Sequence, residues 1–332
     1  MDSGFMQDAL LLIAGFVLLL AGGEYLVRGA VSIARSFGIS PMVIGLTLVG
    51  FGTSAPELVA SINAALKGSP GIALGNVVGS NIANVFLVLG VAALIFPLAT
   101  NREAYRRDGP VLILATAILV MMVLSGEIGR IAGAIGLMLL IAYTSFTWWS
   151  DRRSLDAGAV MHGQEAEEVD EIPQSRIPVA LLMAAGGLVA VLYGADLLVD
   201  GAIGIARGFG LSEAVIGLTI VAIGTSLPEL ATAVVAAWRR HADVAFGNIV
   251  GSCIFNIFGI LGVTALVLPL SVPAEIAVFD VWVAAFAAIV FVIFAMTGWR
   301  IGRGEGAVLA GLYLVYLATQ FSPALRSMIG LA

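Results

Sequence analysis

The 332-residue chain is 60% hydrophobic and 11% charged, with a formal net charge of −6. This composition excludes an ordinary soluble domain and is typical of a membrane protein whose apolar stretches cross the bilayer as helices. The basic residues are sparse and scattered among loops, which argues against nucleic-acid binding. Cys253 is the sole cysteine, and His162 and His241 are the two histidines, so neither an intrachain disulfide nor a transition-metal site is expected.

The apolar segments predict ten membrane spans, five on each side of one polar insertion. The first span has no basic residue before it and continues through Glu24, so we predict a membrane helix and not a cleaved signal peptide. The ten expected spans are 8–34, 41–66, 73–97, 109–125, 131–149, 177–204, 213–237, 245–269, 280–298 and 306–322. The insertion at 151–176 is rich in Asp and Glu and is expected to be a solvated linker.

The positions of Lys and Arg predict the orientation of these spans. Loops after odd-numbered spans, together with the neighbouring span ends, hold 12 of the 16 basic residues. The other face holds Lys67, Arg130, Arg207 and Arg326. Because basic residues concentrate on the cytoplasmic side, both termini are expected outside and the acidic linker in the cytoplasm. The localisation that follows is multi-pass, in the cell (inner) membrane.

The two halves carry the same sequence at one fixed offset. Gly52-Thr-Ser-Ala-Pro-Glu57 recurs as Gly224-Thr-Ser-Leu-Pro-Glu229, and Gly75–Asn84 recurs as Gly247–Asn256. From Gly22 to Leu98, 41 of 77 positions are identical to their counterparts without a gap. The sequence therefore predicts an all-α integral membrane protein built from a duplicated unit.

The duplication also predicts how the two units are oriented. A first five-helix repeat is expected over 1–150, and a second five-helix repeat over 177–332. Because each contains an odd number of spans, equivalent helices should cross the membrane in opposite directions. Such inverted repeats are typical of secondary transporters, whose ion sites lie near the midplane where the repeats meet.

Each copy of the Gly-Thr-Ser-x-Pro-Glu motif is expected to break its helix. A proline removes a backbone donor and clashes with the carbonyl four residues earlier, so Pro56 and Pro228 should free carbonyls beside Thr, Ser and Glu side chains. A charged side chain at the centre of a membrane helix costs about 2.5–3.5 kcal/mol. One copy could be a kinked helix whose glutamate reaches the interface. Two copies, with Glu57 and Glu229 at equivalent places, favour a functional site.

The helix after each break adds neutral oxygens. Ser80 and Asn84 are four residues apart, as are Ser252 and Asn256, so each pair faces in one direction. We expect the combined site to be rich in oxygen and free of sulfur and imidazole, which selects hard cations such as Ca²⁺ or Na⁺. Two carboxylates match the charge of one Ca²⁺.

These motifs resemble the alpha-1 and alpha-2 repeats of the cation/calcium exchanger superfamily, on the sodium/calcium exchanger side, with alpha-1 at 41–98 and alpha-2 at 213–270. The resemblance implies a ten-helix antiporter of prokaryotic type that exchanges Ca²⁺ for Na⁺ by alternating access. Neither a cofactor nor enzymatic activity is expected.

The resemblance also implies the metal ligands. Glu57 and Glu229 would be the central acidic ligands, and Gly50 and Ala222 match positions that contribute backbone carbonyls. The other implied ligands are Thr53, Ser54, Ser80, Asn84, Thr225, Ser226, Ser252 and Asn256. Several family members have an aspartate where this chain has Asn256, so two central carboxylates are expected here, which argues against potassium co-transport.

Two other transport functions stay open at this level. Proton-coupled exchange of Ca²⁺ or another cation is compatible with the paired glutamates. A cation channel is the alternative from another class, although channels more naturally use oligomeric rings of acidic residues. No Gly-x-Gly-Asp pair, nucleophile elbow or His-Glu-x-x-His motif indicates an intramembrane enzyme. The expected partners are Ca²⁺, Na⁺ and the lipid bilayer.

Overall fold

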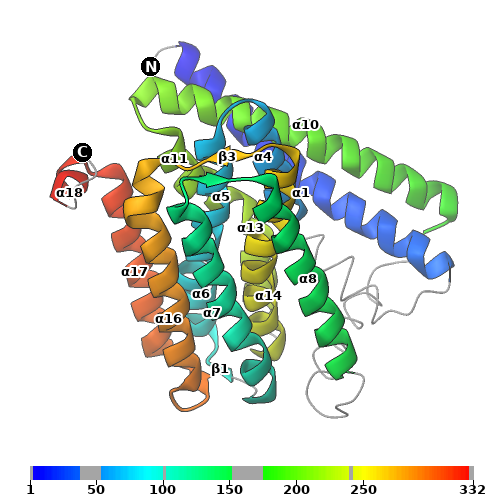
Figure 1. The fold of residues 1–332 in the computed structure, drawn as a ribbon. Helices are drawn as coiled ribbons and strands as arrows, with labels where there is room; N and C mark the ends of the chain where they lie inside the picture. Colours follow the sequence, from blue (N-terminus) through cyan, green and yellow to red (C-terminus); the bar gives the residue numbers. More distant parts are fainter. Residues whose placement is uncertain (1–2, 38–53, 100–101, 152–174, 239–241, 329–332) are drawn as a thin grey trace.

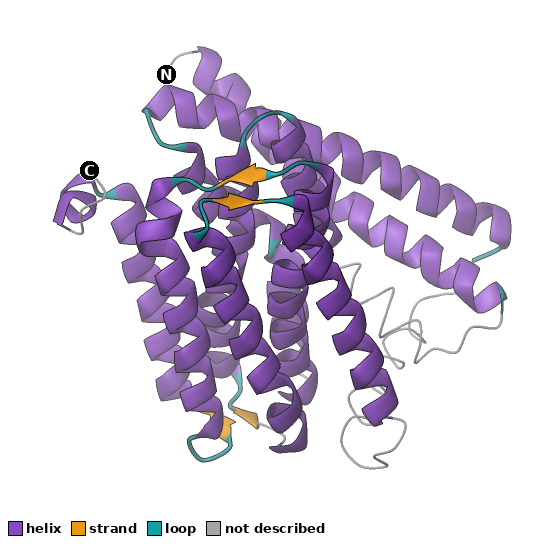
Figure 2. Ribbon diagram, in the orientation of Figure 1, coloured by secondary structure: helices purple, strands orange, loops and turns teal. Residues whose placement is uncertain are grey.

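The computed structural model describes residues 3–37, 54–99, 102–151, 175–238 and 242–328 (Figure 1). These residues form helices and four strands of two residues each (Figure 2). Seven helical stretches are long and apolar enough to cross a membrane, and the bent pair Glu213–Thr225 and Leu227–Trp238 provides an eighth. The structure thus confirms an all-helical membrane architecture.

Two of the ten predicted spans are not among these eight. The span predicted at 41–66 lies partly outside the described residues, and its described part is a helix over Ala55–Leu66. The span predicted at 306–322 is the helix Arg303–Phe321, whose apolar character is diluted by Glu305, Gln320 and two tyrosines. The count of ten therefore stays a prediction.

The described elements of the first half begin with the long helix α1 and end with α8. The π-helical segment η2, which has i to i+5 hydrogen bonding, interrupts the third predicted span. The elements are α1 (Ser3–Ser36), α4 (Ala55–Leu66), α5 (Pro70–Ala83), η2 (Asn84–Val88), α6 (Leu89–Ile95), β1 (Leu98–Ala99), α7 (Arg102–Leu124), β2 (Glu127–Ile128) and α8 (Arg130–Asp151).

The second half contains counterparts of these elements, and among the described residues it adds a π-helical segment before α16 and a short final helix. Its elements are α10 (Ile177–Phe209), α11 (Glu213–Ile216), η3 (Gly217–Val221), α12 (Ala222–Thr225), α13 (Leu227–Trp238), α14 (Ala242–Phe255), η4 (Asn256–Ile260), α15 (Leu261–Val267), β3 (Leu270–Ser271), η5 (Ile276–Asp280), α16 (Val281–Met296), β4 (Arg300–Ile301), α17 (Arg303–Phe321) and α18 (Pro323–Met328). From α4 to β1, every element has a counterpart of the same length at the offset of the sequence repeat, in the series from α13 to β3. The secondary structure therefore follows the sequence repeat residue by residue over this range.

Two antiparallel strand pairs join the halves at opposite ends of the helix bundle. Leu98 of β1 pairs with Ile301 of β4, and Ile128 of β2 pairs with Leu270 of β3. All four of these side chains are fully buried. β1 and β3, which follow equivalent helices, lie at opposite ends of the bundle (Figure 1). The helices that lead into them therefore run in opposite directions.

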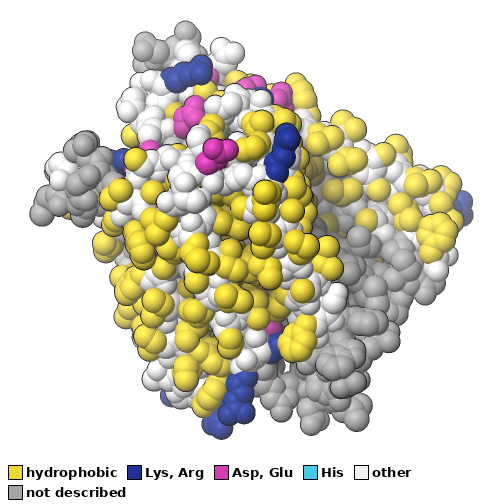
Figure 3. All heavy atoms as spheres, in the orientation of Figure 1, with side chains coloured by type: hydrophobic (Ala, Val, Ile, Leu, Met, Phe, Trp, Pro, Cys, Tyr) yellow, Lys and Arg dark blue, Asp and Glu magenta, His cyan; other side chains and the backbone are white. Residues whose placement is uncertain are grey.

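Burial separates a central layer from a peripheral one. The stretches Pro70–Ile95 and Ala245–Val267 are each 78% buried over their most apolar window, whereas Gly4–Ile33 and Ile177–Phe209 are 28% and 22% buried. Hydrophobic side chains cover most of the face drawn in Figure 3, and charged side chains gather mainly near its two ends. This pattern fits a bilayer around the bundle, with α5 and α14 in its middle.

The peripheral helices α1 and α10 pack directly against each other through glycines. Glycines recur every seven residues on both helices, at 15, 22 and 29 and at 187, 194 and 201. A Cβ added to Gly22 would lie 2.8 Å from the Val191 backbone nitrogen, and one added to Gly194 would lie 2.8 Å from that of Leu19. Small residues allow this close backbone approach in membranes, so α1 and α10 form one tightly packed pair, which we call the α1–α10 unit.

Candidate metal centre

Each central glutamate lies in the first turn of a helix that follows a break. Glu57 is the third residue of α4 and Glu229 the third of α13, and both are 1% exposed. A proline precedes each glutamate at the start of its helix, where its missing N–H costs no hydrogen bond. In the second half, the helix bends by 45° at Ser226. The predicted break is therefore present there; Gly52 and Thr53 of the first copy lie outside the described residues.

Reciprocal hydrogen bonds join the two motifs into one centre. The Ser54 hydroxyl donates to Glu229 Oε1 at 3.0 Å, and the equivalent Ser226 hydroxyl donates to Glu57 Oε1 at 3.1 Å. The two carboxylates are close enough to interact electrostatically. Each half thus supplies a glutamate to the centre and a serine to the glutamate of the other half.

Asn76 holds the two breaks together, and sequence reasoning missed it. Its side-chain amide donates to the Glu57 carbonyl at 3.2 Å and to the Ser61 hydroxyl at 2.9 Å. Its Oδ1 accepts from the Thr225 hydroxyl at 3.0 Å. The equivalent Asn248 donates to the Glu229 carbonyl at 3.5 Å. The repeat could have pointed to Asn76 and Asn248, since each asparagine lies one turn before the predicted Ser ligand of its helix.

Several buried polar atoms of this centre have no hydrogen-bond partner among the described residues. These atoms are Glu57 Oε2, Glu229 Oε2, Ser80 Oγ and both side-chain polar atoms of Asn84 and Asn256. Buried polar groups normally find partners, because leaving one unpaired costs about 1–3 kcal/mol. Their concentration in one place is what a cation site would require.

The asparagines reach this place through the π-helical segments. Asn84 begins η2 and Asn256 begins η4. η2 packs against α13, which carries Glu229, and η4 packs against α4, which carries Glu57. π-helical turns occur frequently at functional sites. The π-helical segment that begins with the asparagine of each half therefore packs against the helix that carries the glutamate of the other half.

The remaining predicted ligands divide into three groups. Ser252 is 5% exposed and lies one turn before Asn256. The Ala222 carbonyl accepts hydrogen bonds from the Ser226 N–H at 3.1 Å and from the Thr225 hydroxyl at 3.4 Å, so its role as a metal ligand stays a prediction. Gly50 and Thr53 lie outside the described residues.

One expectation about the chemistry of the centre needs correction. A centre free of sulfur was expected, but Cys253, which is 1% exposed, lies near Asn84 and Glu229. Its counterpart in the first half is Asn81, whose amide donates to the Val77 carbonyl at 2.8 Å. Among the residues that the structure describes, no three His, Cys, Asp or Glu side chains cluster. The centre thus offers two carboxylates and neutral oxygens, with a thiol beside them.

Comparison with known proteins identifies the family. A model of the family described as sodium/calcium exchanger protein matches residues 8–150 and 179–322, which together make up most of the chain. The chain belongs to the sodium/calcium exchanger family.

Relatives and a solved structure agree with this assignment. The putative antiporter CaxA of Alkalimonas amylolytica is 37% identical over 93% of this chain and 97% of its own. The sodium/calcium exchanger MaX1 of Methanosarcina acetivorans is 35% identical over 94% and 98%. A structure of the sodium-calcium exchanger NCX_Mj soaked with Na⁺ and Sr²⁺ superposes with a TM-score of 0.63 at 32% identity, covering 94% of this chain and 98% of that one.

In this member of the family, further buried charges lie away from the central glutamates. Asp108 accepts two hydrogen bonds from the Arg107 guanidinium, at 2.7 and 3.0 Å, and one from Tyr143 at 3.1 Å. Its counterpart in the second half, Asp280, instead accepts from Tyr316 at 3.0 Å and Gln320 at 2.6 Å. Neither aspartate was singled out from the sequence: Asp108 directly precedes the span expected at 109–125, and Asp280 begins the span expected at 280–298.

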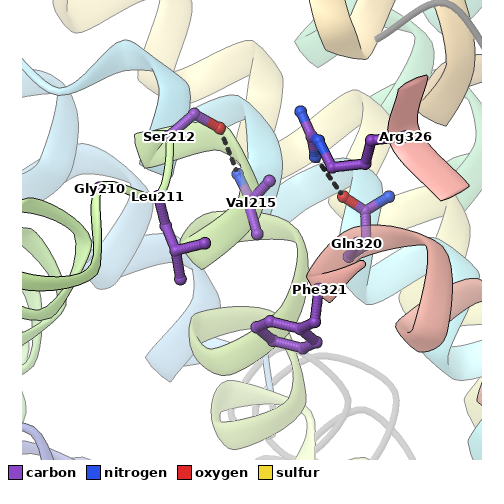
Figure 4. Close-up of a pocket in the computed structure, with 7 residues that line it drawn as sticks. All are labelled: Gly210, Leu211, Ser212, Val215, Gln320, Phe321 and Arg326. Carbon is purple, nitrogen blue, oxygen red and sulfur yellow. Dashed lines mark hydrogen bonds between the residues drawn. The ribbon is translucent and has the colours of Figure 1, made fainter. Parts of the chain in front are cut away.

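A cavity in this exchanger-family protein lies where α10 passes into α11. Its volume is about 280 Å³. Its polar groups are paired: Ser212 accepts from the Val215 N–H, and Arg326 donates to Gln320 (Figure 4). The lining residues are Gly210, Leu211, Ser212, Val215, Gln320, Phe321 and Arg326. None of the predicted metal ligands lines it.

Proposed function

We propose that this protein is a secondary active antiporter that exchanges Ca²⁺ for Na⁺ by alternating access. The observation that carries the proposal is the reciprocal pairing of Ser54 with Glu229 and Ser226 with Glu57. It puts two buried carboxylates and their oxygen-rich surroundings into one centre between two equivalent halves. The names of MaX1 and NCX_Mj describe proteins with this exchange activity.

The architecture we propose is ten transmembrane helices in two inverted five-helix repeats, 1–150 and 177–332, joined by the acidic linker 151–176. The fixed offset shared by sequence and secondary structure supports it. So do β1 and β3, which follow equivalent helices and lie at opposite ends of the bundle. Ion sites of inverted-repeat transporters lie where the repeats meet. The excess of Lys and Arg on one face supports termini outside and the linker in the cytoplasm, in the cell (inner) membrane.

In this proposal Glu57 and Glu229 neutralise the transported Ca²⁺, and the neighbouring hydroxyls and amides complete its coordination. Ca²⁺ takes about 6–8 oxygen ligands in flexible geometry, which carboxylate, amide and hydroxyl oxygens can provide. The neutral ligands we propose are Thr53, Ser54, Ser80, Asn84, Thr225, Ser226, Ser252, Asn256 and the carbonyls of Gly50 and Ala222. No cofactor enters, because the ions are substrates.

Competition for this centre explains why transport in one direction requires transport in the other. Two uncompensated carboxylates in a low-dielectric interior are unfavourable, so the empty centre should resist changing sides. Ca²⁺ or Na⁺ removes that barrier by neutralising Glu57 and Glu229. Since both ions use the same carboxylates, binding of one from one side must follow release of the other.

The decisive test is ⁴⁵Ca²⁺ uptake into proteoliposomes loaded with Na⁺. Uptake that requires an outward Na⁺ gradient, and that stops when Na⁺ is equal on both sides, supports the antiporter. Uptake driven by a pH gradient would assign proton coupling instead. Ca²⁺ flux that depends on no counter-ion gradient would identify a channel and remove the exchanger from consideration.

A further inference from the structure

Lys67, in the turn between α4 and α5, is ion-paired to the peripheral helix α10. Its ammonium lies 2.6 Å from an Asp196 carboxylate oxygen, 2.6 Å from Asp200 Oδ1 and 3.0 Å from the Asp196 carbonyl oxygen. Its side chain is 22% exposed, and those of the two aspartates are 47% and 51% exposed. One cation of the central layer therefore holds three oxygens of α10.

The protonation state of Lys67 supports a permanent ion pair. Burial lowers the pKa of the Lys67 ammonium, but the hydrogen bonds to Asp196 and Asp200 outweigh that effect and raise the pKa above its usual value. Lys67 is therefore charged throughout the physiological pH range.

This contact joins two parts of the molecule that are packed differently. Within the α1–α10 unit, glycines bring the two backbones into direct contact. Towards the central layer, α1 places the Phe16 ring against Gly224, where an added Cβ would collide with it. Lys67 adds a charged attachment next to this apolar one. The two helices of the α1–α10 unit therefore pack tightly against each other. The contacts of the unit with the central layer include Phe16 with Gly224 and Lys67 with α10.

Among the described residues, the equivalent positions of the first half make no such attachment. The counterpart of Asp196 is Glu24 and that of Asp200 is Arg28, and these two pair with each other within α1. The acid and the base of α1 form an ion pair with each other, whereas Asp196 and Asp200 of α10 are both acidic and need a cation from another element. Arg239, the counterpart of Lys67, lies outside the described residues. Among those described, the tether belongs to one end of the bundle.

We infer that the ion pairs of Lys67 with Asp196 and Asp200 tether the α1–α10 unit to the central layer and set the balance between the two conformations of the transport cycle. This inference rests on the proposed alternating access. The tether stabilises the conformation seen in the structure, in which α10 lies beside the α4–α5 turn. It makes Lys67 a positioning residue that never touches the transported ion.

The size of the effect follows from the exposure of the pair. Partly exposed ion pairs contribute modestly, and two carboxylates on one ammonium should alter the conformational equilibrium by roughly two- to fivefold. When the state that binds an ion becomes less populated, the apparent affinity for that ion falls by the same factor. Loss of the tether must therefore raise the Ca²⁺ KM on one face of the membrane and lower it on the other.

The experiment measures Na⁺-dependent Ca²⁺ uptake in right-side-out and everted vesicles from cells expressing each variant. Lys67→Gln, Asp196→Asn and Asp200→Asn should shift the Ca²⁺ KM by about two- to fivefold in opposite directions in the two preparations. Lys67→Arg keeps the charge and should restore both values. Glu24→Gln is the matched control, because it removes the equivalent acid from α1, and it should change neither KM.

Two results would overturn the tether. One is a Lys67→Gln protein whose KM values equal those of the wild type in both preparations. The other is a lower maximal rate with both KM values unchanged, which indicates a general folding defect.

A second readout separates failure of the tether from failure of the proposed function. Hydrogen exchange in nanodiscs should become faster in the peptides around Lys67 and Asp196 of Lys67→Gln but not of Glu24→Gln. A wild-type protein that does not exchange Ca²⁺ for Na⁺, together with faster hydrogen exchange in Lys67→Gln, refutes the proposed function and retains the tether. Unchanged hydrogen exchange refutes the tether whatever the transport result.

Discussion

The two halves of the molecule agree closely at the central glutamates and differ at a second equivalent pair of buried acids, Asp108 and Asp280. At the centre, Ser54 and Ser226 make equivalent bonds to Glu229 and Glu57, at 3.0 and 3.1 Å. Away from the centre, Asp108 is paired with an arginine, whereas its counterpart Asp280 is bonded to neutral groups.

This difference indicates which contacts must be the same in both halves for the protein to function. A centre that both halves line, and that must work from either side of the membrane, constrains both copies in the same way. A buried aspartate outside the centre needs a donor of some kind: Asp108 finds one in Arg107 of its own helix and another in Tyr143, whereas Asp280 finds donors in Tyr316 and Gln320 of α17. Four experiments test this difference between the centre and the buried aspartates, in order of decreasing effect.

The strongest test compares Glu57→Gln with Glu229→Gln. Each removes one of the two charges that we propose face Ca²⁺, and loss of one partner from a buried ionic site costs roughly 3–5 kcal/mol. We expect both variants to lose Ca²⁺ uptake by at least about 100-fold, measured in proteoliposomes with Na⁺ inside. Retention of transport by either variant would show that the centre is not equivalent in its two halves.

Substitution of Asp108 and of Asp280 should change the free energy of unfolding by different amounts. Asp108→Asn separates a buried bidentate ion pair with Arg107 and should lower the free energy of unfolding by roughly 2–4 kcal/mol. Asp280→Asn keeps an acceptor for Tyr316 and Gln320 and should change it by less than about 1 kcal/mol. Thermal unfolding in detergent measures both. Equal destabilisation would mean that the two clusters are energetically alike despite their different partners.

The glycines of the α1–α10 unit should again behave as a matched pair. Gly22 and Gly194 are equivalent, and a Cβ at either would lie 2.8 Å from the partner backbone. Gly22→Ala and Gly194→Ala should each destabilise the protein by about 1–3 kcal/mol, because overpacking forces the helices apart. Gly186→Ala is the control, since a Cβ there meets nothing within 4 Å. Destabilisation by Gly186→Ala would mean that the loss of stability arises at the lipid-facing surface and not at the contact between α1 and α10.

The smallest expected effect is that of the serines. Ser54→Ala and Ser226→Ala each remove one hydroxyl from the glutamate of the opposite half. A net hydrogen bond contributes about 1 kcal/mol, so each variant should raise the Ca²⁺ KM roughly fivefold. Isotope uptake at graded Ca²⁺ concentrations measures this. A difference of more than about threefold between the two would contradict equivalence at the centre.

Sequence predicted the parts of the structure that local pattern determines. The third span, expected at 73–97, is the helical stretch Pro70–Ile95, and the sixth, expected at 177–204, is α10, Ile177–Phe209. The central glutamates were predicted because the repeat marks them twice. Ser54 and Ser226 were predicted with them, since they belong to the same motif.

The parts that sequence missed depend on contacts between distant segments. Asn76 of α5 meets Thr225 of α12, and Lys67 meets Asp200 of α10, in each case across the boundary between the two halves. Hydropathy and periodicity carry no information about such pairs. The π-helical turns η2 and η4 were missed for another reason: an i to i+5 turn has no composition that distinguishes it from the helix around it.

The seam of glycines between α1 and α10 also has a consequence for biogenesis. The ribosome delivers α1 to the membrane long before it delivers α10, so the glycine face of α1 first meets lipid and finds its partner after the sixth span is inserted. The two strand pairs and the serine–glutamate bonds also join the first half to the second. Assembly of this protein is therefore closer to the docking of two subunits than to folding from one end, because the contacts that join the halves cannot form before the second half is inserted.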